Sequence, residues 1–596
     1  MNPLENLLTA DELTPFVWAL LLVPFLMFIA YQRMQTYMMF YQQEEYDSPR
    51  FIRWLQHHRA WDRQASMVLL AAVLMTILGQ YRQMAFLLDF SLVPVVLAFA
   101  LAHKRSQDNV RSSKKPLVRT ERVRRINRIA TLILLSITGA FVIAACFLPN
   151  GTRLVLEANW GSLLSPFETL DWRLTGLYLV YGAVIQLVPF VLMVGNKLLE
   201  PYESRVQAKF LKEAREKFNQ LNPTVIAITG SFGKTSSKHI LQHILSAVHP
   251  TLATPGSVNT EMGITRVIRE QLSEDHRYFI VEMGAYGPGS IARLCRLTPP
   301  DVGLITAVGP AHYERFKTLE TVSHAKFELA AATAANQASR ASDQSVSGQA
   351  VQGTVVVNAD GIPAELLSDR IKDVPANYIK VGSDGDISLA KVQQKADGLH
   401  LTLLENKEDA TAQEHQLFVP LHGPHQVENI VSAVAVARAL GLPFSIIRAS
   451  LKSLPQIRHR TEVDRSGPVA TVNDAYNSNP IGFEGALIAL NAVVESGGRR
   501  ILVTPGMVEL GAKHDSEHNK LGIIAAQKCD VILVVSPLRI PTFVDGIKSV
   551  KNDALTLIEY QTQSQAEDWV RQNVRAGDAV LYENNLPDLY ESPPRF

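Results

Sequence analysis

The sequence TVIAITGSFGKTSSKH, residues 224–239, decides how the rest of the chain is interpreted. Its first half, Val225 to Thr229, is apolar and rich in β-branched residues, which is typical of a buried strand. The run ends at Gly230, and apolar residues with helical spacing follow from Leu241 onward. Backbone N–H groups at such a turn point towards an anion, and the dipole of the following helix favours negative charge. The stretch therefore predicts a phosphate-binding strand–turn–helix.

The turn matches the short motif G-x-x-G-K-[ST], because Ile228 stands where the longer P-loop motif has its first glycine. In such a motif the lysine, here Lys234, reaches the terminal phosphates of a nucleotide, and Thr235 holds Mg²⁺. The residues expected to contact the nucleotide here are Gly230, Ser231, Gly233, Lys234, Thr235 and Ser236. The alternative is an ordinary glycine-bearing turn between a strand and a helix. The lysine and threonine directly after the glycine favour phosphate binding.

Length, net charge and cysteine content limit the number of domains and the classes of protein to which the chain can belong. The chain has 596 residues, enough for about three or four domains, and a net charge of +1. That charge alone argues neither for nor against nucleic acid, and we predict no nucleic-acid partner. Cys146, Cys295 and Cys529 are far apart and form no C-x-x-C pattern. A disulfide framework or a zinc knuckle is therefore not expected.

The first two hundred residues consist mainly of apolar stretches and basic loops. Five stretches predict membrane-spanning helices, at residues 15–31, 66–79, 84–103, 129–148 and 174–196. The first could instead be a signal peptide, but Glu5, Asp11 and Glu12 precede it and no Lys or Arg does. It also lacks a small-residue cleavage site, so we expect an uncleaved span.

The charges of the loops predict the orientation of these spans. Residues 104–128 are densely basic and residues 32–64 carry five arginines, whereas residues 149–173 carry only Arg153 and Arg173. Loops rich in Lys and Arg stay in the cytoplasm. We therefore predict a multi-pass protein of the cytoplasmic (inner) membrane, with the N-terminus outside and the catalytic domains inside. A charged amphipathic linker helix is expected over residues 200–222.

After the linker, strands and helices alternate, which predicts two α/β domains with doubly wound sheets. The apolar run at residues 278–282 reads as a strand that ends in the carboxylate of Glu282, at the sheet edge where α/β proteins bind ligands. Glu282 is thus an expected Mg²⁺ ligand, with a capping or surface role as the alternative. The expected organisation is an α-helical membrane domain at 1–199, the linker at 200–222, a P-loop ATP-binding domain at 223–455 and a Rossmann-like domain at 456–596.

Seven ordered blocks carry a more specific resemblance. They are GSFGKTSS, VEMGAYGPGSIARL, DVGLITAVGPAH with AKFEL shortly after it, GPHQVEN, IRHRTE, DAYNSNP and PGMVELG. Over roughly residues 223–580 the chain resembles the Mur ligases, most of all the branch that adds D-alanyl-D-alanine to a muramyl tripeptide. The resemblance implies an ATP-dependent ligase that phosphorylates a carboxylate and lets an amine attack the acyl phosphate. Catalysis of this kind is mainly positioning and charge neutralisation.

The resemblance also implies two Mg²⁺ ions and a modified lysine. Thr235 and Glu282 would hold one ion, and His312 would help to hold the second. Lys326 matches a lysine that CO₂ converts to a carbamate, whose negative charge supports the metal site where an unmodified cation would oppose it. Two cations then flank the transferring phosphoryl group. Lys234, His312 and Lys326 are accordingly the expected catalytic residues.

Further matches concern the nucleotide and the substrates. Asn429 matches the residue that contacts adenine, while Arg460 and Asp474 match residues that close over the nucleotide, at the phosphates and the ribose respectively. The implied substrate contacts are Asn259, Tyr476, Asn477 and Asn479. His514 and His518 are expected to be surface histidines rather than ligands.

Two departures from the family leave the substrates open. Mur ligases begin with a domain that holds the UDP-sugar, and here the membrane helices stand in its place. The tail at residues 577–590 replaces the usual Gly-Ser-bearing ending after the last strand. Both the carboxylate substrate and the amine are therefore unassigned, while the reaction class stays the same.

The resulting prediction is a membrane-anchored ligase that forms an amide bond in cell-wall peptide synthesis. Its expected partners are ATP, a carboxylate-bearing envelope peptide precursor, an amino acid or dipeptide, membrane lipid and other cell-wall enzymes. An alternative acceptor is a lipid-linked or other envelope polymer, such as a γ-glutamyl chain. An ATP-driven transporter is disfavoured because no ABC-type signature is present, and a catalytically dead scaffold because Lys234, Glu282, His312 and Lys326 are retained.

Overall fold

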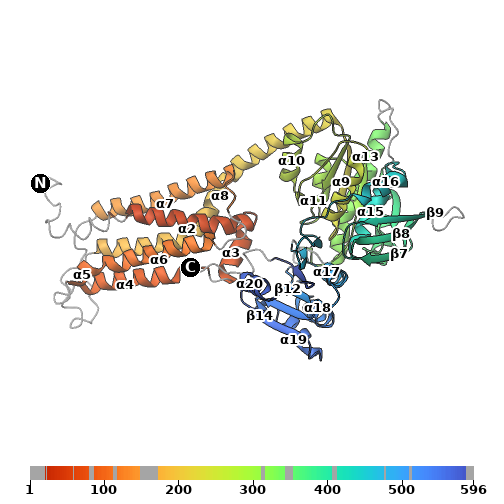
Figure 1. Cartoon of the computed structure of the whole chain (residues 1–596). Coiled ribbons are helices and arrows are strands. Elements are labelled where there is room, and N and C mark those ends of the chain that lie inside the picture. The colour runs from red at the N-terminus through yellow and green to blue at the C-terminus, as the bar shows by residue number, and fades with distance from the viewer. Residues whose placement is uncertain are drawn as a thin grey trace. The chain divides into compact units, whose positions relative to one another are not determined.

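The structure is a computed structural model that describes residues 21, 23–57, 60–79, 86–111, 117–147, 172–309, 316–342, 353–405, 413–475, 478–508, 510 and 513–585. The chain divides into two compact units (Figure 1). The described residues up to 206 form a helical unit, and the described residues from 207 onward form an α/β unit.

The described part of the helical unit is built from helices of very different lengths. They are α2 (Val23–Gln43), α3 (Ser48–His57), α4 (Arg63–Gly79), α5 (Phe86–Phe90), α6 (Leu92–Arg111), α7 (Glu121–Phe147) and the first part of α8 (Trp172–Leu221). Their shared core contains Met34 and Tyr37 of α2, Phe99 of α6 and Tyr181 of α8. A buried ion pair joins Arg33 of α2 to Asp62.

Two helices of the described chain are long and apolar enough to cross a membrane. They cover residues 121–143 in α7 and 175–221 in α8, and they coincide with the fourth and fifth predicted spans. The second predicted span corresponds to the shorter apolar helix α4, and the third is divided between α5 and α6. The first span lies partly outside the described residues. The fifth span and the predicted linker are parts of one continuous helix, α8, which contains Pro189 and Pro201.

The α/β unit begins with a nine-stranded sheet in the order β2-β3-β1-β4-β5-β6-β7-β8-β9. The strands as far as β7 run parallel, and β7, β8 and β9 pair antiparallel at one edge. The strands are β1 (Thr224–Thr229), β2 (Thr251–Ala253), β3 (Tyr278–Glu282), β4 (Val302–Ile305), β5 (Thr354–Asn358), β6 (Asn377–Val381), β7 (Ile387–Lys395), β8 (Gly398–Glu405) and β9 (Gln413–Val419).

Helices cover both faces of this sheet, as expected for parallel strands that are buried on both sides. Ile226 and Ile228 of β1 pack towards α9 (Lys234–Ser246), α15 (Gln426–Ala439) and α16 (Phe444–Lys452). Val225 and Ala227 point to the opposite face, because successive strand residues alternate. That face is covered by α10 (Glu261–Glu270), α11 (Ser290–Leu297), α13 (Leu319–Ser342), α14 (Ala364–Asp373) and the end of α8.

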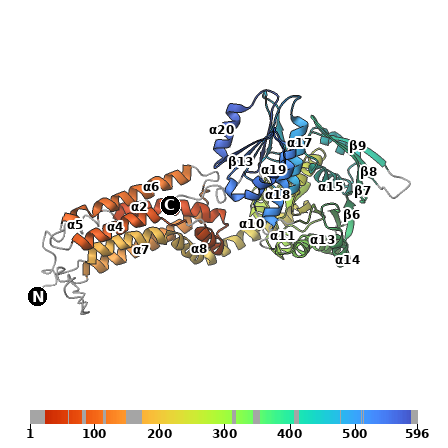
Figure 2. The same ribbon diagram turned by 90° about the horizontal axis from the view of Figure 1, so that it is seen from below.

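A second sheet of six strands follows in the order β10-β11-β15-β12-β13-β14, and it is parallel except for β10. Its strands are β10 (Glu462–Asp464), β11 (Ala470–Asp474), β12 (Arg500–Thr504), β13 (Val531–Val535), β14 (Thr556–Tyr560) and β15 (Ala579–Glu583). One face packs on α17 (Pro480–Val493), α18 (His514–Lys528) and α19 (Pro541–Ser549), and the other on α20 (Gln563–Asn573) (Figure 2). Two α/β domains were expected, and the structure contains them.

Candidate active site

The turn predicted to bind phosphate has the backbone that its glycines allow. The strand β1 ends at Thr229, and α9 begins at Lys234 with Gly233 as its N-cap residue in the left-handed conformation, at φ 82°. A Cβ atom on Gly233 would overlap the Oδ1 atom of Asn429. The position therefore needs glycine for two reasons, its backbone angle and its close approach to α15. The predicted strand–turn–helix is confirmed.

Lys234 is folded over the turn. Its Nζ donates hydrogen bonds to the carbonyl oxygens of Gly230, at 2.7 Å, and Ser231, at 3.3 Å. Burial of the ammonium group lowers the pKa of Lys234, Arg460 and Lys238 lower it further, and Glu282 opposes them. An anion bound at the turn would raise the pKa of Lys234, because an opposite charge favours the ammonium form.

Glu282 lies at the end of β3, in register with Ile228 of β1. Its Oε2 accepts hydrogen bonds from Thr235 Oγ1, at 3.0 Å, and from Lys238 Nζ, at 2.9 Å. Its Oε1 accepts one from Asn259 Nδ2, at 3.2 Å. Burial alone would raise the pKa of Glu282, but the nearby ammonium groups and these hydrogen bonds lower it below its ordinary value. Glu282 is therefore a buried carboxylate anion.

Lys238 is a member of this cluster that the sequence interpretation missed. Its side chain is fully buried, and its Nζ contacts both the Glu282 carboxylate and the carbonyl oxygen of Gly256. Burial lowers the pKa of Lys238, and the neighbouring carboxylate opposes that effect. A signal was present in the sequence, because Lys234 and Lys238 are four residues apart and so lie on one face of α9.

The oxygen atoms of Thr235 and Glu282 suit Mg²⁺. This ion prefers oxygen ligands, takes one or two carboxylates and keeps several waters or phosphate oxygens. The described residues hold no cluster of three or more His, Cys, Asp or Glu side chains. Asn259 is held beside Glu282, and its Oδ1 accepts a hydrogen bond from the Tyr286 hydroxyl, at 3.2 Å. His312 lies outside the described residues.

Lys326 lies on α13 and is 3% exposed. No hydrogen bond joins it to another residue in the described part of the chain. Burial lowers its pKa well below the ordinary value for lysine, and repulsion from Lys234 adds to the effect. A neutral amine is the form that can react with CO₂, so the environment of Lys326 suits the expected carbamate.

A cavity of about 440 Å³ opens beside the turn, between the two α/β domains. Its size is in the usual range for small-ligand sites. Its lining includes the predicted nucleotide contacts Gly233, Ser236, Asn429 and Arg460, together with Asn479. Asn479 also caps α17, because its Oδ1 accepts a hydrogen bond from Gly482 N at 3.0 Å. The structure thus brings five of the predicted residues to one cavity.

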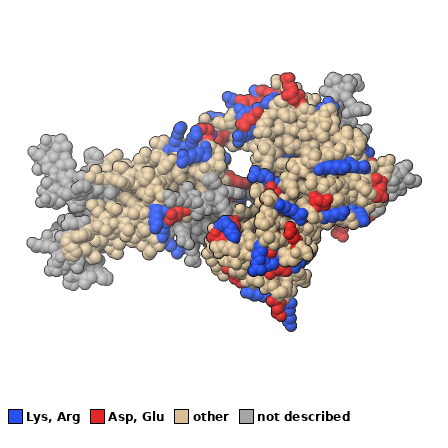
Figure 3. Space-filling view, in the orientation of Figure 1, with Lys and Arg blue, Asp and Glu red and all other residues tan. Residues whose placement is uncertain are grey.

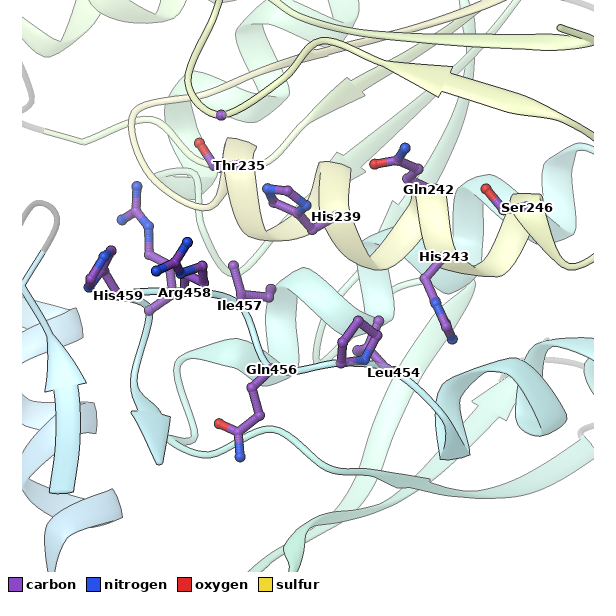
Figure 4. Close-up of a pocket in the computed structure, with 13 residues that line it drawn as sticks. Thr235, His239, Gln242, His243, Ser246, Leu454, Gln456, Ile457, Arg458 and His459 are labelled. Carbon is purple, nitrogen blue, oxygen red and sulfur yellow. The ribbon is translucent and has the colours of Figure 1, made fainter. Parts of the chain in front are cut away.

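A second cavity, of about 540 Å³, lies along α9 (Figure 4). Thr235, His239 and His243 of α9 line one side, and Arg458 and His459 come from the segment after α16. Its further lining residues are Gln242, Ser246, Gly256, Leu454, Pro455, Gln456, Ile457 and Arg460. No carboxylate is among the lining residues, so this cavity suits an acidic ligand. Its position beside Thr235 places such a ligand next to the predicted phosphate site.

Asp474 and Glu583 face each other at the ends of β11 and β15. Asp474 Oδ1 accepts a hydrogen bond from Thr461 N at 3.0 Å, and Ser478 donates one to Glu583 Oε1. Burial raises the pKa of Asp474 to about 6, although Arg460 partly opposes the rise. Burial and the charge of Asp474 raise the pKa of Glu583 well above its ordinary value. The two buried carboxyls cannot both ionise without cost.

Glu583 was not among the predicted residues. Asp474 was, but it does not line either of the two cavities described here. Tyr476 and Asn477 lie outside the described residues. The prediction that His518 is a surface residue is wrong: its side chain is fully buried, and its Nε2 accepts a hydrogen bond from Met507 N at 3.0 Å. A turn beside β12 needs that acceptor, which the sequence alone does not reveal.

Comparison with known proteins agrees with this geometry. Residues 228–437 match the Mur ligase middle domain, and residues 459–583 match the Mur ligase, glutamate ligase domain. The UDP-N-acetylmuramoyl-tripeptide–D-alanyl-D-alanine ligase of Bacillus subtilis (strain 168) is 25% identical over 390 residues, which are 64% of this chain and 79% of that protein. The same-named enzyme of Mycobacterium tuberculosis (strain H37Rv) is 32% identical over 317 residues, which are 51% of this chain and 56% of that enzyme.

A solved structure shows the same arrangement. The crystal structure of MurF ligase from Thermotoga maritima in complex with ADP superposes with a TM-score of 0.52 and 26% identity, over 65% of this chain and 82% of that one. The two domain matches together span more than half of the present chain and contain both the phosphate-binding turn and the buried Glu282. The chain therefore belongs to the Mur ligase family of ATP-dependent amide-forming ligases.

Proposed function

We propose that the chain is a membrane-anchored ligase of the type that joins D-alanyl-D-alanine to a muramyl peptide in peptidoglycan synthesis. The observation that carries this proposal is the cluster of Lys234, Thr235 and Glu282 at adjoining strand ends, with the buried amine of Lys326 nearby. The names of the similar enzymes support the choice of substrates. ATP binding is supported by the ADP complex of the similar structure.

Each residue then has a stated task in the transfer of the γ-phosphoryl group to a carboxylate. Lys234 moves from the turn carbonyls to the phosphates, and the turn amides hold the same oxygens. Thr235 and Glu282 would hold Mg²⁺, which would supply positive charge against the phosphates. Lys326 would carry a carbamate, which would replace a repelling buried cation with an anion. Arg460, which lines both cavities, neutralises charge between the nucleotide and the acidic acceptor.

The membrane anchor is proposed from where apolar side chains are exposed. Nearly all of the large hydrophobic side chains that are exposed in the described chain belong to the helical unit; Val248, Val392, Ile481 and Leu538 are the ones outside it. Such a concentration exceeds what the surface of a water-soluble domain carries. Figure 3 shows the same unit largely free of charged side chains along its length, with Lys and Arg gathered towards one end. The gathering of Lys and Arg at one end supports a multi-pass helical unit whose basic loops lie in the cytoplasm, together with the ligase domains.

Membrane anchoring also favours a second candidate acceptor, a lipid-linked or γ-glutamyl envelope polymer. A soluble UDP-linked acceptor gains nothing from an enzyme fixed to the bilayer, whereas a lipid-linked one is concentrated there. Other cell-wall enzymes at the same membrane are further proposed partners.

The test uses the detergent-purified full chain with ATP, Mg²⁺ and bicarbonate. Muramyl tripeptides, lipid-linked muramyl peptides and γ-glutamyl chains serve as acceptors, and D-alanyl-D-alanine or single amino acids serve as amines. ADP release that requires both an acceptor and an amine is the expected result, and Lys234→Met should abolish it. Lys548→Met is the matched control, because Lys548 is an exposed surface lysine. ATP turnover that ignores every amine would refute the ligase assignment.

A further inference from the structure

An open cavity lies between α2 and α7 of the helical unit. Its volume is about 580 Å³. The lining residues are Tyr31 and Gln35 of α2, and Arg119, Val123, Arg124, Asn127, Arg128, Thr131 and Leu132 on or just before α7. Every lining residue belongs to the helical unit, and none has a role in the phosphoryl transfer proposed above.

The cavity is strongly cationic. Three arginines line it, and no Asp or Glu does. Arg124 pairs with Glu121 at the surface, at 2.5 Å, but Arg119 and Arg128 have no acidic partner among the described residues. Arginine is the side chain best shaped for binding phosphate, because its planar donors match two oxygens at once. Two such side chains at one cavity therefore point to an anion with several oxygens.

Two side-chain amides add a second, independent indication. In the described part of the chain, Gln35 Nε2 and Asn127 Oδ1 are shielded from solvent and have no hydrogen-bond partner. Asn127 is 9% exposed. An enclosed donor or acceptor without a partner costs about 1–3 kcal/mol, so such groups are rare unless a ligand or water satisfies them. Both belong to the lining of this cavity. Of the two atoms, the Gln35 Nε2 donor is the one that can pair with a phosphate oxygen, because Asn127 Oδ1 is an acceptor.

The surfaces that lead away from the cavity are apolar. On α2, the side chains of Phe25 and Phe28 are 62% and 54% exposed, and Tyr31 continues their line at helical spacing. On α7, Leu132 and Leu135 are 62% and 47% exposed. These two rows of exposed apolar side chains, one on α2 and one on α7, form two apolar ridges beside the basic cavity. A basic cavity next to apolar ridges suits an amphiphile, which has a charged headgroup and a hydrocarbon chain.

The two ridges extend in the same direction. Near the basic end, Gln42 of α2 exchanges hydrogen bonds with the backbone of Val118, at 3.0 Å in each direction. Further along, Tyr31 and Leu132 line one cavity. The helices α2 and α7 are therefore antiparallel, and their apolar ridges both run away from the basic end. This end is the one that loop charge assigns to the cytoplasmic face.

We infer that the cavity between α2 and α7 binds the phosphate-bearing headgroup of a membrane lipid, with the lipid chain lying along the exposed ridges of the two helices. Arg119 and Arg128 hold the phosphate oxygens, and Gln35 donates to one of them. The inference rests on the membrane placement proposed above. It gives the helical unit a ligand-binding role beyond anchoring.

The test measures equilibrium binding of lipids to the detergent-purified full chain. The probes are a polyprenyl pyrophosphate, phosphatidylglycerol, neutral phosphatidylcholine and inorganic pyrophosphate. The test variant is Arg119→Ala/Arg128→Ala, and the charge-matched control is Arg63→Ala/Lys104→Ala, whose residues are exposed bases of the helical unit outside the cavity. Gln35→Leu removes a cavity donor without changing the net charge.

We expect one or both lipid phosphates to bind more tightly than the neutral lipid. The test variant should weaken that binding roughly tenfold or more relative to the control. Gln35→Leu should weaken it as well. If the test and control variants lose lipid binding equally, the binding depends on surface charge in general and not on the cavity, which would overturn the inference. Inorganic pyrophosphate that binds as tightly as the lipids would overturn it too, because the lipid chain would then contribute nothing.

ADP release with a soluble acceptor separates the two proposals. The test variant should keep this activity, since Arg119 and Arg128 take no part in phosphoryl transfer. A chain that binds the lipid phosphate but releases no ADP with any acceptor and amine would refute the ligase function alone. A chain with ligase activity whose lipid binding ignores the cavity variants would refute the cavity alone.

Discussion

The buried ion pair between Lys238 and Glu282 provides a sharp test of the site. Both side chains are essentially unexposed, at 0% and 1%, and their Nζ and Oε2 atoms are 2.9 Å apart. Lys238→Met removes the cation and leaves Glu282 buried. Breaking such a pair costs about 3–5 kcal/mol, because the remaining charge is uncompensated. Thr235 and Asn259 still donate to Glu282, so we expect the lower end, about 3 kcal/mol.

This loss is measurable by thermal unfolding of the full chain. The Tm is taken from the unfolding transition that moves when ATP is added, because that transition belongs to the domain that contains Lys238. For a domain of this size, about 3 kcal/mol corresponds to a fall in Tm of about 6–12 °C. Lys548→Met is the control: its pair with Glu559 is exposed and 3.5 Å long, so its loss should lie within about 0.5 kcal/mol of zero.

The double variant Lys238→Met/Glu282→Gln decides whether charge is the cause. If the single losses arise from an unpaired buried charge, removing both charges should recover much of the stability, with a coupling energy of at least about 2 kcal/mol. Losses that simply add, within about 0.5 kcal/mol, would refute the reasoning. Mg²⁺ gives a second readout. On the proposed Mg²⁺ site, the ion would compete with Lys238 for Glu282 Oε2, so saturating Mg²⁺ should raise the Tm of Lys238→Met more than that of the wild type.

Three further predictions concern single substitutions. Lys326→Ala should abolish acceptor-dependent ADP release, and short-chain carboxylic acids that replace the carbamate should restore part of it; near-normal activity without them would exclude the carbamate. Gly233→Ala should lower the Tm far more than Gly441→Ala, because both have φ near +82° to +85° but only Gly233 is crowded by a neighbouring side chain; equal losses of Tm would mean that backbone strain alone matters. The raised pKa of Glu583 gives stability that is complete below its unfolded value, near 4.5, and is lost as the pH rises through the folded pKa. The free energy of unfolding of Glu583→Gln, measured between about pH 5 and pH 8, should therefore decline less with pH than that of the wild type, and parallel curves would contradict the raised pKa of Glu583.

Much of the nucleotide site could be predicted because it is encoded locally. The strand, the glycines and the start of α9 lie within sixteen consecutive residues, and their backbone requirements are visible in the sequence. Glu282 could be predicted because the ends of parallel strands meet at one edge of a sheet. Lys238 carried a weaker signal. Its spacing from Lys234 places it on the same face of α9, but a buried lysine is indistinguishable from a solvated one until its carboxylate partner is located.

The pairing of Asp474 with Glu583 had no local signal. The two residues are more than a hundred positions apart, and they meet because β15 inserts between β11 and β12 in the second sheet. Strand order of this kind depends on how the whole domain packs. The burial of His518 has the same origin, since its partner is the backbone N–H of Met507 on the turn after β12. Polar residues placed by distant chain segments are the ones that sequence patterns miss.

The same limit applies to the apolar helices, where composition alone cannot separate a membrane span from a protein core. The helix α15 is as rich in Val and Ala as a span, yet its apolar residues are enclosed by the nine-stranded sheet and α9, with Ile430 and Val434 fully buried. The helix α7 has a similar composition but leaves Leu132 and Ile143 about 60% exposed. Water penalises that exposure by roughly 25 cal/mol for each Å² of apolar surface, whereas a lipid bilayer does not. The exposed faces of α2 and α7, rather than their hydropathy, are therefore the stronger argument that this ligase works at a membrane.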